Sequence, residues 1–180
     1  MTDLVLERKF AAALTPADVM AMAVEAAGCF GIHRIEWNMS LLAGSGQRLA
    51  CWFTAPDMES ARIAMRQSDI DASVAWPCDV YAGPAVSEQD LQSANVLVER
   101  SFDESVSLQD IQAIEDAGAR CLEIRNVRFI RTFFSRDRKR MLCLYAAPDA
   151  ESVRAAQREA GVPFTDAWPF VTVSPKSTFP

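Results

Sequence analysis

One ten-residue stretch of this chain occurs twice. Residues 51–60 read Cys-Trp-Phe-Thr-Ala-Pro-Asp-Met-Glu-Ser, and residues 143–152, 92 positions later, read Cys-Leu-Tyr-Ala-Ala-Pro-Asp-Ala-Glu-Ser. The same shift, applied without a gap, aligns further identical residues, which are Glu7 and Arg8 with Glu99 and Arg100, Phe10 with Phe102, Asp18 with Asp110, Cys29 with Cys121, and Ala75-Trp76-Pro77 with Ala167-Trp168-Pro169. The chain is therefore predicted to consist of two copies of one structural unit.

The composition is that of an ordinary globular protein. The chain has 180 residues, of which 50% are hydrophobic and 23% are charged, so it can bury a substantial core. No window approaches the roughly 18 consecutive apolar residues of a membrane span, and the first residues lack the pattern of a signal peptide. We expect a cytoplasmic protein without a membrane partner.

Charge and cysteine content narrow the expected partners further. The net charge is −6, with 6 basic and 12 acidic residues in positions 1–94 but 12 of each in positions 95–180. An acidic chain with a neutral second half is a poor nucleic-acid binder, so no nucleic-acid partner is expected. The five cysteines are predicted to be free thiols in a reducing compartment, because four of them form two repeat-related pairs.

Each copy follows the same order of predicted elements. In the first copy, strands are predicted over residues 4–10, 35–41, 48–55 and 73–81. One helix is predicted to begin after Thr15 and another after Pro56-Asp57, since hydroxyl and carboxylate side chains cap helix N-termini. The second copy repeats this order, with Ser107 and Pro148-Asp149 at the corresponding helix starts. The order is β-α-β-β-α-β, twice.

This order predicts an α+β fold of two tandem ferredoxin-like domains, each with an antiparallel four-stranded sheet. Helices can cover only one face of each sheet, so the other face needs a cover, for which the sister copy is the candidate. We therefore expect two sheets packed face to face as a pseudo-dimer within one chain. The predicted boundaries are residues 1–82 for the first repeat, 83–94 for a linker and 95–180 for the second repeat.

The repeated unit resembles a small ferredoxin-like family of uncharacterised bacterial domains that includes a nickel-responsive, nickel-binding protein. The resemblance rests on residues 98–102 in the first strand, on Asp137 and residues 141–151 around the hairpin, and on residues 160–163 after the second helix. It implies the ferredoxin-like fold and, through the nickel-binding member, a nickel ion as a cofactor. The family pattern often has a histidine in the second helix, where this chain has Ala64 and Ala156.

Four residues are candidate metal ligands because both copies retain them. Cys51 and Cys143 lie on the predicted third strands, and Glu7 and Glu99 lie on the first strands. The first and third strands are central neighbours in this fold, so a Glu and a Cys could approach one another if they share a face. Thiolate with carboxylate suits zinc or nickel. The alternative is that the cysteines are core residues and that each glutamate pairs with an arginine.

Two further residues are candidates for binding a small molecule or cofactor. Trp76 and Trp168, each followed by proline, could line a pocket between the sheets, since aromatic residues are common in such pockets. The alternative is that both are large core residues. No catalytic residue is assigned, because the sequence contains no phosphate-binding glycine loop, no CxxC, no nucleophile elbow and no HExxH.

These observations favour a small, non-catalytic protein that binds a small molecule or a metal ion. The first alternative is an enzyme of the dimeric α/β-barrel type, acting on a small aromatic or quinone-like molecule. The second alternative is an assembly module that uses exposed sheet edges. The expected state is a monomeric pseudo-dimer or a homodimer.

Overall fold

The computed structural model describes residues 1–84 and 86–176. In the first half the elements are, in order, β1 (Thr2–Lys9), α1 (Pro16–Ile32), β2 (Glu36–Ala43), β3 (Arg48–Ala55), α2 (Met58–Gln67), a short 3-10 turn η1 (Ala72–Val74) and β4 (Ala75–Ala82). In the second half they are α3 (Glu88–Leu91), β5 (Val96–Ser101), α4 (Leu108–Ile124), β6 (Arg128–Ser135), β7 (Arg140–Ala146), α5 (Ala150–Glu159) and β8 (Asp166–Val173). The predicted element order is found in both halves, with α3 added in the predicted linker.

The helices begin where capping side chains predict. Thr15 accepts a hydrogen bond from the backbone N–H of Asp18 at the start of α1, and the Asp18 carboxylate accepts one from the Thr15 backbone N–H in return. Ser107 caps α4 by accepting a hydrogen bond from the backbone N–H of Asp110. Local sequence therefore determines where these helices start.

Both β-strand hairpins turn at a residue with a positive φ. Gly46 has φ 72°, a backbone angle that favours glycine, and a Cβ there would lie 2.6 Å from the carbonyl oxygen of Leu14, so the available space requires glycine. Arg138, 92 positions on, occupies the same turn with φ 63°. The turn geometry is thus kept in the second half without a glycine.

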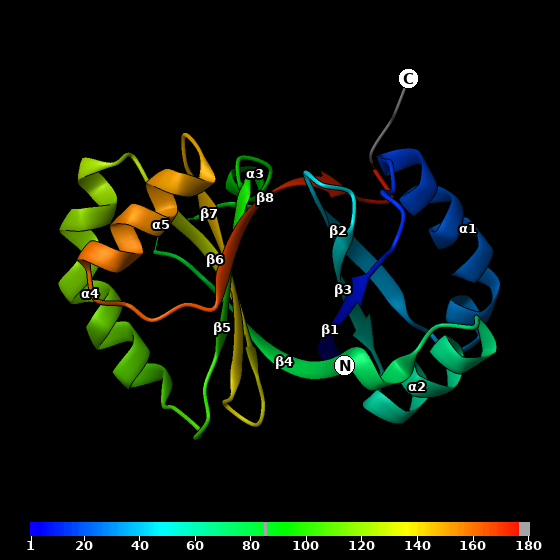
Figure 1. Cartoon of the computed structure of the whole chain (residues 1–180). Coiled ribbons are helices and arrows are strands. Elements are labelled where there is room, and N and C mark those ends of the chain that lie inside the picture. Colours follow the sequence, from blue (N-terminus) through cyan, green and yellow to red (C-terminus); the bar gives the residue numbers. More distant parts are fainter. Residues whose placement is uncertain (85, 177–180) are drawn as a thin grey trace. The chain divides into compact units, whose positions relative to one another are not determined.

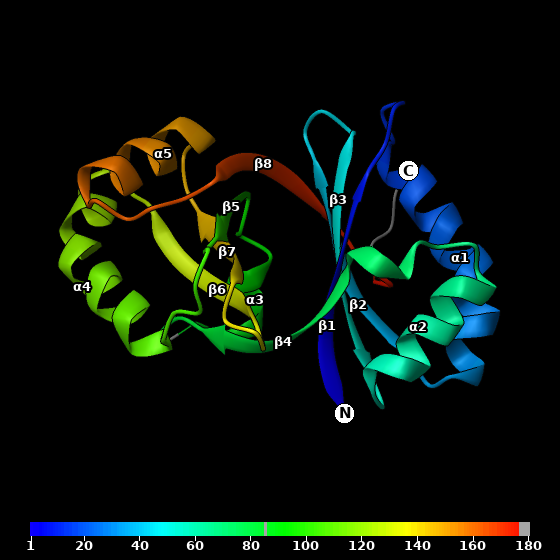
Figure 2. The same cartoon turned by 60° about the horizontal axis from the view of Figure 1, so that its bottom comes forward.

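The strand pairing within the halves keeps the 92-residue offset. β1 pairs antiparallel with β3 so that Leu6 is opposite Cys51, and β5 pairs with β7 so that Val98 is opposite Cys143. The pairing of β2 with β3 shifts register after Trp37, and that of β6 with β7 shifts after Phe129. Figures 1 and 2 show α1 and α2 together on one face of β1, β2 and β3, and α4 and α5 together on one face of β5, β6 and β7.

The predicted fold class is wrong in how the strands join. The hydrogen-bonded strand order of the described residues is β1-β3-β2-β8-β5-β7-β6-β4, which closes on itself as one barrel. Two tandem ferredoxin-like domains with separate four-stranded sheets packed face to face would not give this order. The closed order follows from β4 and β8, since β4 lies next to β6 and β8 lies next to β2.

The reason lies in the length of these two strands. Each has eight residues, of which only four pair with the first strand of the same half: Ala75–Cys78 pair with Leu6–Asp3, and Asp166–Pro169 pair with Glu99–Val96. The chain accordingly divides into two compact units inside these strands. Unit 1 comprises Met1–Cys78 with Val171–Pro180, and unit 2 comprises Asp79–Phe170.

Each unit has its own apolar core between helices and strands. The core of unit 1 includes Leu4, Phe53, Ala64 and Met65, and it includes Val173 from the end of β8. The core of unit 2 includes Val98, Cys143 and Tyr145. Of the linker and second repeat predicted above, residues 85 and 177–180 lie outside the described residues.

None of the helices in the described part of the chain combines the length and the hydropathy that a membrane crossing requires.

Candidate functional site

The predicted glutamate ligands bind tryptophan side chains. The indole Nε1 of Trp76 donates a hydrogen bond to Glu7 Oε1 at 2.8 Å, and that of Trp168 donates one to Glu99 Oε1 at the same distance. Both tryptophans are 7% exposed. The structure therefore brings each predicted tryptophan together with the predicted glutamate of its own half, in two matching pairs.

The predicted cysteine ligands lie on the other face of each sheet. Because Leu6 is opposite Cys51 in the β1–β3 pairing, Glu7 points to the face opposite that of the thiol. The same alternation separates Glu99 from Cys143, which is opposite Val98. The structure therefore does not bring Glu7 together with Cys51, or Glu99 together with Cys143.

Both thiols are buried and hydrogen-bonded. Ser40 Oγ donates to Cys51 Sγ at 2.9 Å, and Thr132 Oγ1 lies 3.2 Å from Cys143 Sγ. Burial raises the pKa of Cys51 to about 11, against the opposing effects of the Ser40 hydrogen bond and the Arg8 charge. Burial also raises the pKa of Cys143. At neutral pH these residues are therefore thiols rather than thiolates.

No cluster of three or more His, Cys, Asp or Glu side chains suited to a metal ion is found in the part of the chain that the structure describes. Metal binding by Cys51, Cys143, Glu7 and Glu99 stays a prediction.

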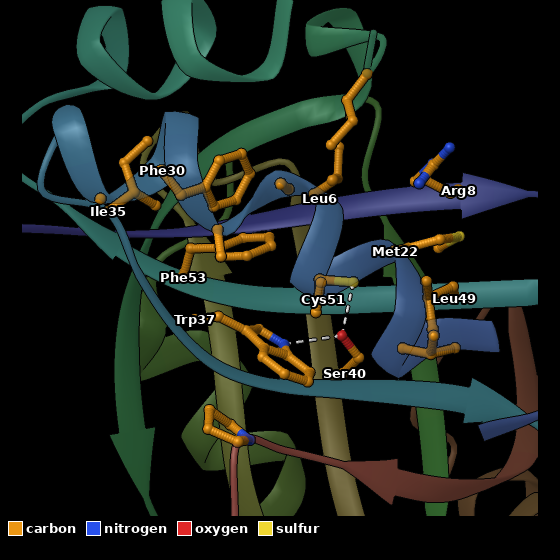
Figure 3. A pocket seen from close by; sticks show the side chains of 17 residues that line it. Leu6, Arg8, Met22, Phe30, Ile35, Trp37, Ser40, Leu49, Cys51 and Phe53 are labelled. Atoms are coloured by element: carbon orange, nitrogen blue, oxygen red, sulfur yellow. Dashed lines mark hydrogen bonds between the residues drawn. The ribbon is translucent and has the colours of Figure 1, made fainter. Parts of the chain in front are cut away.

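Unit 1 contains a pocket between α1 and the helix-facing side of its strands (Figure 3). Its volume is about 250 Å³. The side chains that line it are mostly apolar, and they are Leu6, Val19, Met22, Ala23, Ala26, Ala27, Phe30, Ile35, Trp37, Leu49, Cys51, Phe53, Ile70 and Pro175, with Gly31, Arg8 and Ser40 completing the set. Phe30 and Phe53 meet edge to face, with ring centroids 5.3 Å apart.

The polar groups of this pocket come from the three strands. Trp37 Nε1 donates to Ser40 Oγ at 3.0 Å, and Ser40 in turn donates to Cys51, so this chain of hydrogen bonds is satisfied internally (Figure 3). The remaining polar group is the Arg8 guanidinium, whose carbon lies 4.8 Å from the centroid of the Phe10 ring. Among the lining residues there is no carboxylate and no imidazole.

Of the residues predicted as sites, only Cys51 lines this pocket, and it does so as a neutral thiol. Arg8 was not predicted as a site residue, although it is retained as Arg100 at the repeat offset. The available signal was that residues around this arginine differ between the copies, with Ala23 in the first and Glu115 in the second. An arginine that both copies keep, among neighbours of different polarity, indicates that its binding partner differs between the copies.

Comparison with known proteins finds a family similarity in the second half. The family model described as "Nickel responsive protein SCO4226-like" matches residues 97–169, which is less than half of the chain. This match supports the predicted resemblance to the nickel-responsive family for that part. No curated protein matches the chain.

Several solved structures resemble the whole chain. A crystal structure named "Putative Chlorite dismutase" covers 96% of this chain and 94% of its own, at 10% identity and a TM-score of 0.49. An anthrone oxidase-like protein covers 98% and 94%, at 10% identity and a TM-score of 0.46. A heme-binding protein from Thermus thermophilus covers 95% and 91%, at 9% identity and a TM-score of 0.46.

Proposed function

We propose that this chain is a non-catalytic binding protein for a small apolar molecule and that the pocket of unit 1 is its site. The observation that carries the proposal is the pocket of about 250 Å³ between α1 and the strands. An engineered apolar cavity of about 150 Å³ suffices to bind benzene, so this volume admits a somewhat larger molecule. Apolar walls with a few placed polar groups are typical of small-molecule sites.

Binding rather than turnover is proposed because of the chemistry of the lining. General acid–base catalysis needs a group that exchanges a proton near neutral pH, usually His, Glu or Asp. The pocket is lined by none of these, and its thiol, Cys51, has a raised pKa. The Arg8 guanidinium has hydrogen-bond donors and no acceptor, so it can attract or orient a ligand.

A neutral alkyl probe tests the pocket directly. Calorimetric titration with 1-octanol is expected to show one site per chain, because the alkyl chain fills apolar volume without needing a charged partner. Ala23→Phe places a ring among the lining residues and is expected to weaken octanol binding at least tenfold.

The matched control is Ala21→Phe, an exposed position of the same helix that does not line the pocket. This variant is expected to bind octanol like the unchanged protein. The proposal is wrong if octanol does not bind, or if the two variants weaken its binding equally.

Nickel binding is a second candidate, favoured by the family match of residues 97–169. Cys143 lies in that segment, and a cysteine thiolate is a suitable ligand for nickel or zinc. Binding would have to displace the thiol proton, because a metal binds the thiolate and burial raises the pKa of this residue.

Titration with Ni²⁺ separates this candidate from the first. If nickel is the ligand, the unchanged protein binds it in the micromolar range, binding strengthens with rising pH, and Cys143→Ser abolishes it. Nickel binding that is unchanged in Cys143→Ser would show that this residue is not a ligand. If the unchanged protein does not bind nickel at all, the nickel function is wrong.

A further inference from the structure

The two halves place the same arginine in different surroundings. Arg8 is opposite Leu49 in the β1–β3 pairing, and Arg100 is opposite Met141, 92 positions on, in the β5–β7 pairing. Each lies two residues from the partner of the cysteine, so both side chains leave their strand on the helix-facing side. The backbone therefore presents both guanidinium groups in the same way.

In unit 2 the protein itself supplies partners for the two terminal nitrogens of this guanidinium. The Arg100 side chain is 0% exposed. Its Nη1 donates to the carbonyl oxygen of Pro163 at 2.6 Å, and its Nη2 donates to Gln157 Oε1 at 3.1 Å and to the Tyr145 hydroxyl at 3.3 Å. The Glu115 carboxylate, from α4, lies 3.4 Å from Nη2 and supplies the opposite charge.

In unit 1 the side chains at the corresponding positions cannot do this. Ala23 stands in place of Glu115, Phe53 in place of Tyr145, and Met65 in place of Gln157. Ala23 and Phe53 both line the pocket, together with Arg8. The space that acidic and polar groups occupy around Arg100 is thus apolar or empty around Arg8.

Arg8 has no internal acid to replace Glu115. Within residues 1–84 and 86–176, no carboxylate forms an ion pair with Arg8, whose guanidinium instead lies over the Phe10 ring. A guanidinium at an apolar cavity is the group best suited to a planar anion, since its N–H groups match the two oxygens of a carboxylate.

We propose that the pocket takes an apolar carboxylic acid, with the ligand carboxylate on Arg8 in the place that Glu115 takes on Arg100. The hydrocarbon part of the ligand occupies the volume lined by Met22, Phe30 and Phe53. This proposal rests on the proposed function of the pocket and adds the chemical class of its ligand.

The first half as a whole carries an excess of acid, with 6 basic and 12 acidic residues in positions 1–94. Long-range attraction therefore does not favour an anion there, and preference for one would come from Arg8 itself.

A matched pair of probes, octanoate and 1-octanol, distinguishes the contribution of the ligand's charge to binding from that of its hydrocarbon chain. Calorimetric titration at neutral pH is expected to show octanoate binding at least tenfold tighter than octanol. Arg8→Met is expected to remove this preference while octanol binding is kept. Arg66→Met, at an exposed arginine that pairs with Glu59 on α2, is the control for a change in net charge and leaves the preference intact.

A second pair of variants tests the same point without removing Arg8. Ala23→Glu provides the carboxylate that Glu115 provides in unit 2, so it is expected to occupy Arg8 and abolish the octanoate preference. Ala23→Gln takes the same space without charge and keeps the preference, even if both probes bind less tightly.

The outcomes distinguish the two proposals. Octanol binding without any preference for octanoate, or a preference that survives Arg8→Met, overturns the carboxylate assignment and leaves the pocket as an apolar site. Failure of both probes to bind overturns the pocket function and the carboxylate assignment together.

Discussion

At the scale of single residues, side chains adjacent in the sequence lie on opposite faces of a strand and make different contacts. Glu7 binds Trp76 on one face, while Arg8 lines a pocket on the other. The alternation of a strand explains why Glu7 and Cys51 do not meet, although they lie on adjacent strands. Each glutamate accepts an indole N–H from the tryptophan of its own half.

The buried Arg100 leads to a prediction for stability. Glu115→Ala leaves a buried guanidinium without its countercharge and is expected to lower the free energy of unfolding by about 3 kcal/mol. Arg100→Met combined with Glu115→Ala is expected to recover part of this loss, because an apolar side chain needs no countercharge. Chemical denaturation measures both.

Arg8→Met is the matched comparison in the first half. Since Arg8 is only partly buried and has no internal acid, its replacement is expected to change the free energy of unfolding by less than about 1 kcal/mol. Equal losses of unfolding free energy in Glu115→Ala and Arg8→Met would contradict this difference, in which Arg100 depends on a countercharge and Arg8 does not.

At the scale of elements, the two long helices carry glycines in different settings. A Cβ at Gly118 in α4 would lie 2.5 Å from the Cβ of Ala160, so this helix packs closely against the end of α5. A Cβ at Gly28 in α1 would meet no atom within 4 Å. Gly118 is thus required by close packing, whereas Gly28 is an exposed helix position where glycine brings only flexibility.

The two glycines are therefore expected to respond to alanine in opposite directions. Gly118→Ala should lower the free energy of unfolding by about 1–3 kcal/mol, because the added methyl group overpacks the contact. Gly28→Ala should raise it by about 0.5–1 kcal/mol, because alanine restricts the unfolded chain and favours the helix. Thermal and urea unfolding measure both, and a stabilising Gly118→Ala would show that the helices can separate at little cost.

At the scale of the whole molecule, the strand order joins the halves into one closed barrel. The unit boundaries fall inside β4 and β8, so the last residues of β8 belong to the first unit rather than the second. Val173, near the end of β8, is fully buried in the core of unit 1, and Pro175 lines the pocket.

The last residues of β8 are therefore expected to stabilise unit 1. Val173→Ala should lower the free energy of unfolding by about 2 kcal/mol, from lost burial and the cavity left behind. Amide hydrogen exchange should accelerate mainly in β1, β2 and β3. Val171→Ala, at a position that is 50% exposed on the same strand, should cost less than about 0.5 kcal/mol. Faster exchange confined to β5, β6 and β7 would contradict this assignment.

Local features of the fold could be predicted because their causes lie within a few residues. Thr15 and Ser107 start helices through their own backbone contacts, and alternating side chains define the strands on either side of each hairpin. The candidate site was predicted less well. The copies drew attention to the retained Glu7 and Cys51, whereas the pocket depends on what surrounds Arg8, and its neighbours Ala23 and Phe53 come from other elements.

The repeat by itself determined the element order and which residue of one half corresponds to which residue of the other. Only the tertiary structure decided that β4 and β8 close a barrel. The side chains of a strand alternate between its two faces whichever strand lies beside it, so this pattern does not reveal the neighbour. Only the tertiary structure likewise decided that Arg100 pairs with Glu115 while Arg8 lines a cavity, since the partners of a charged side chain come from distant positions in the sequence.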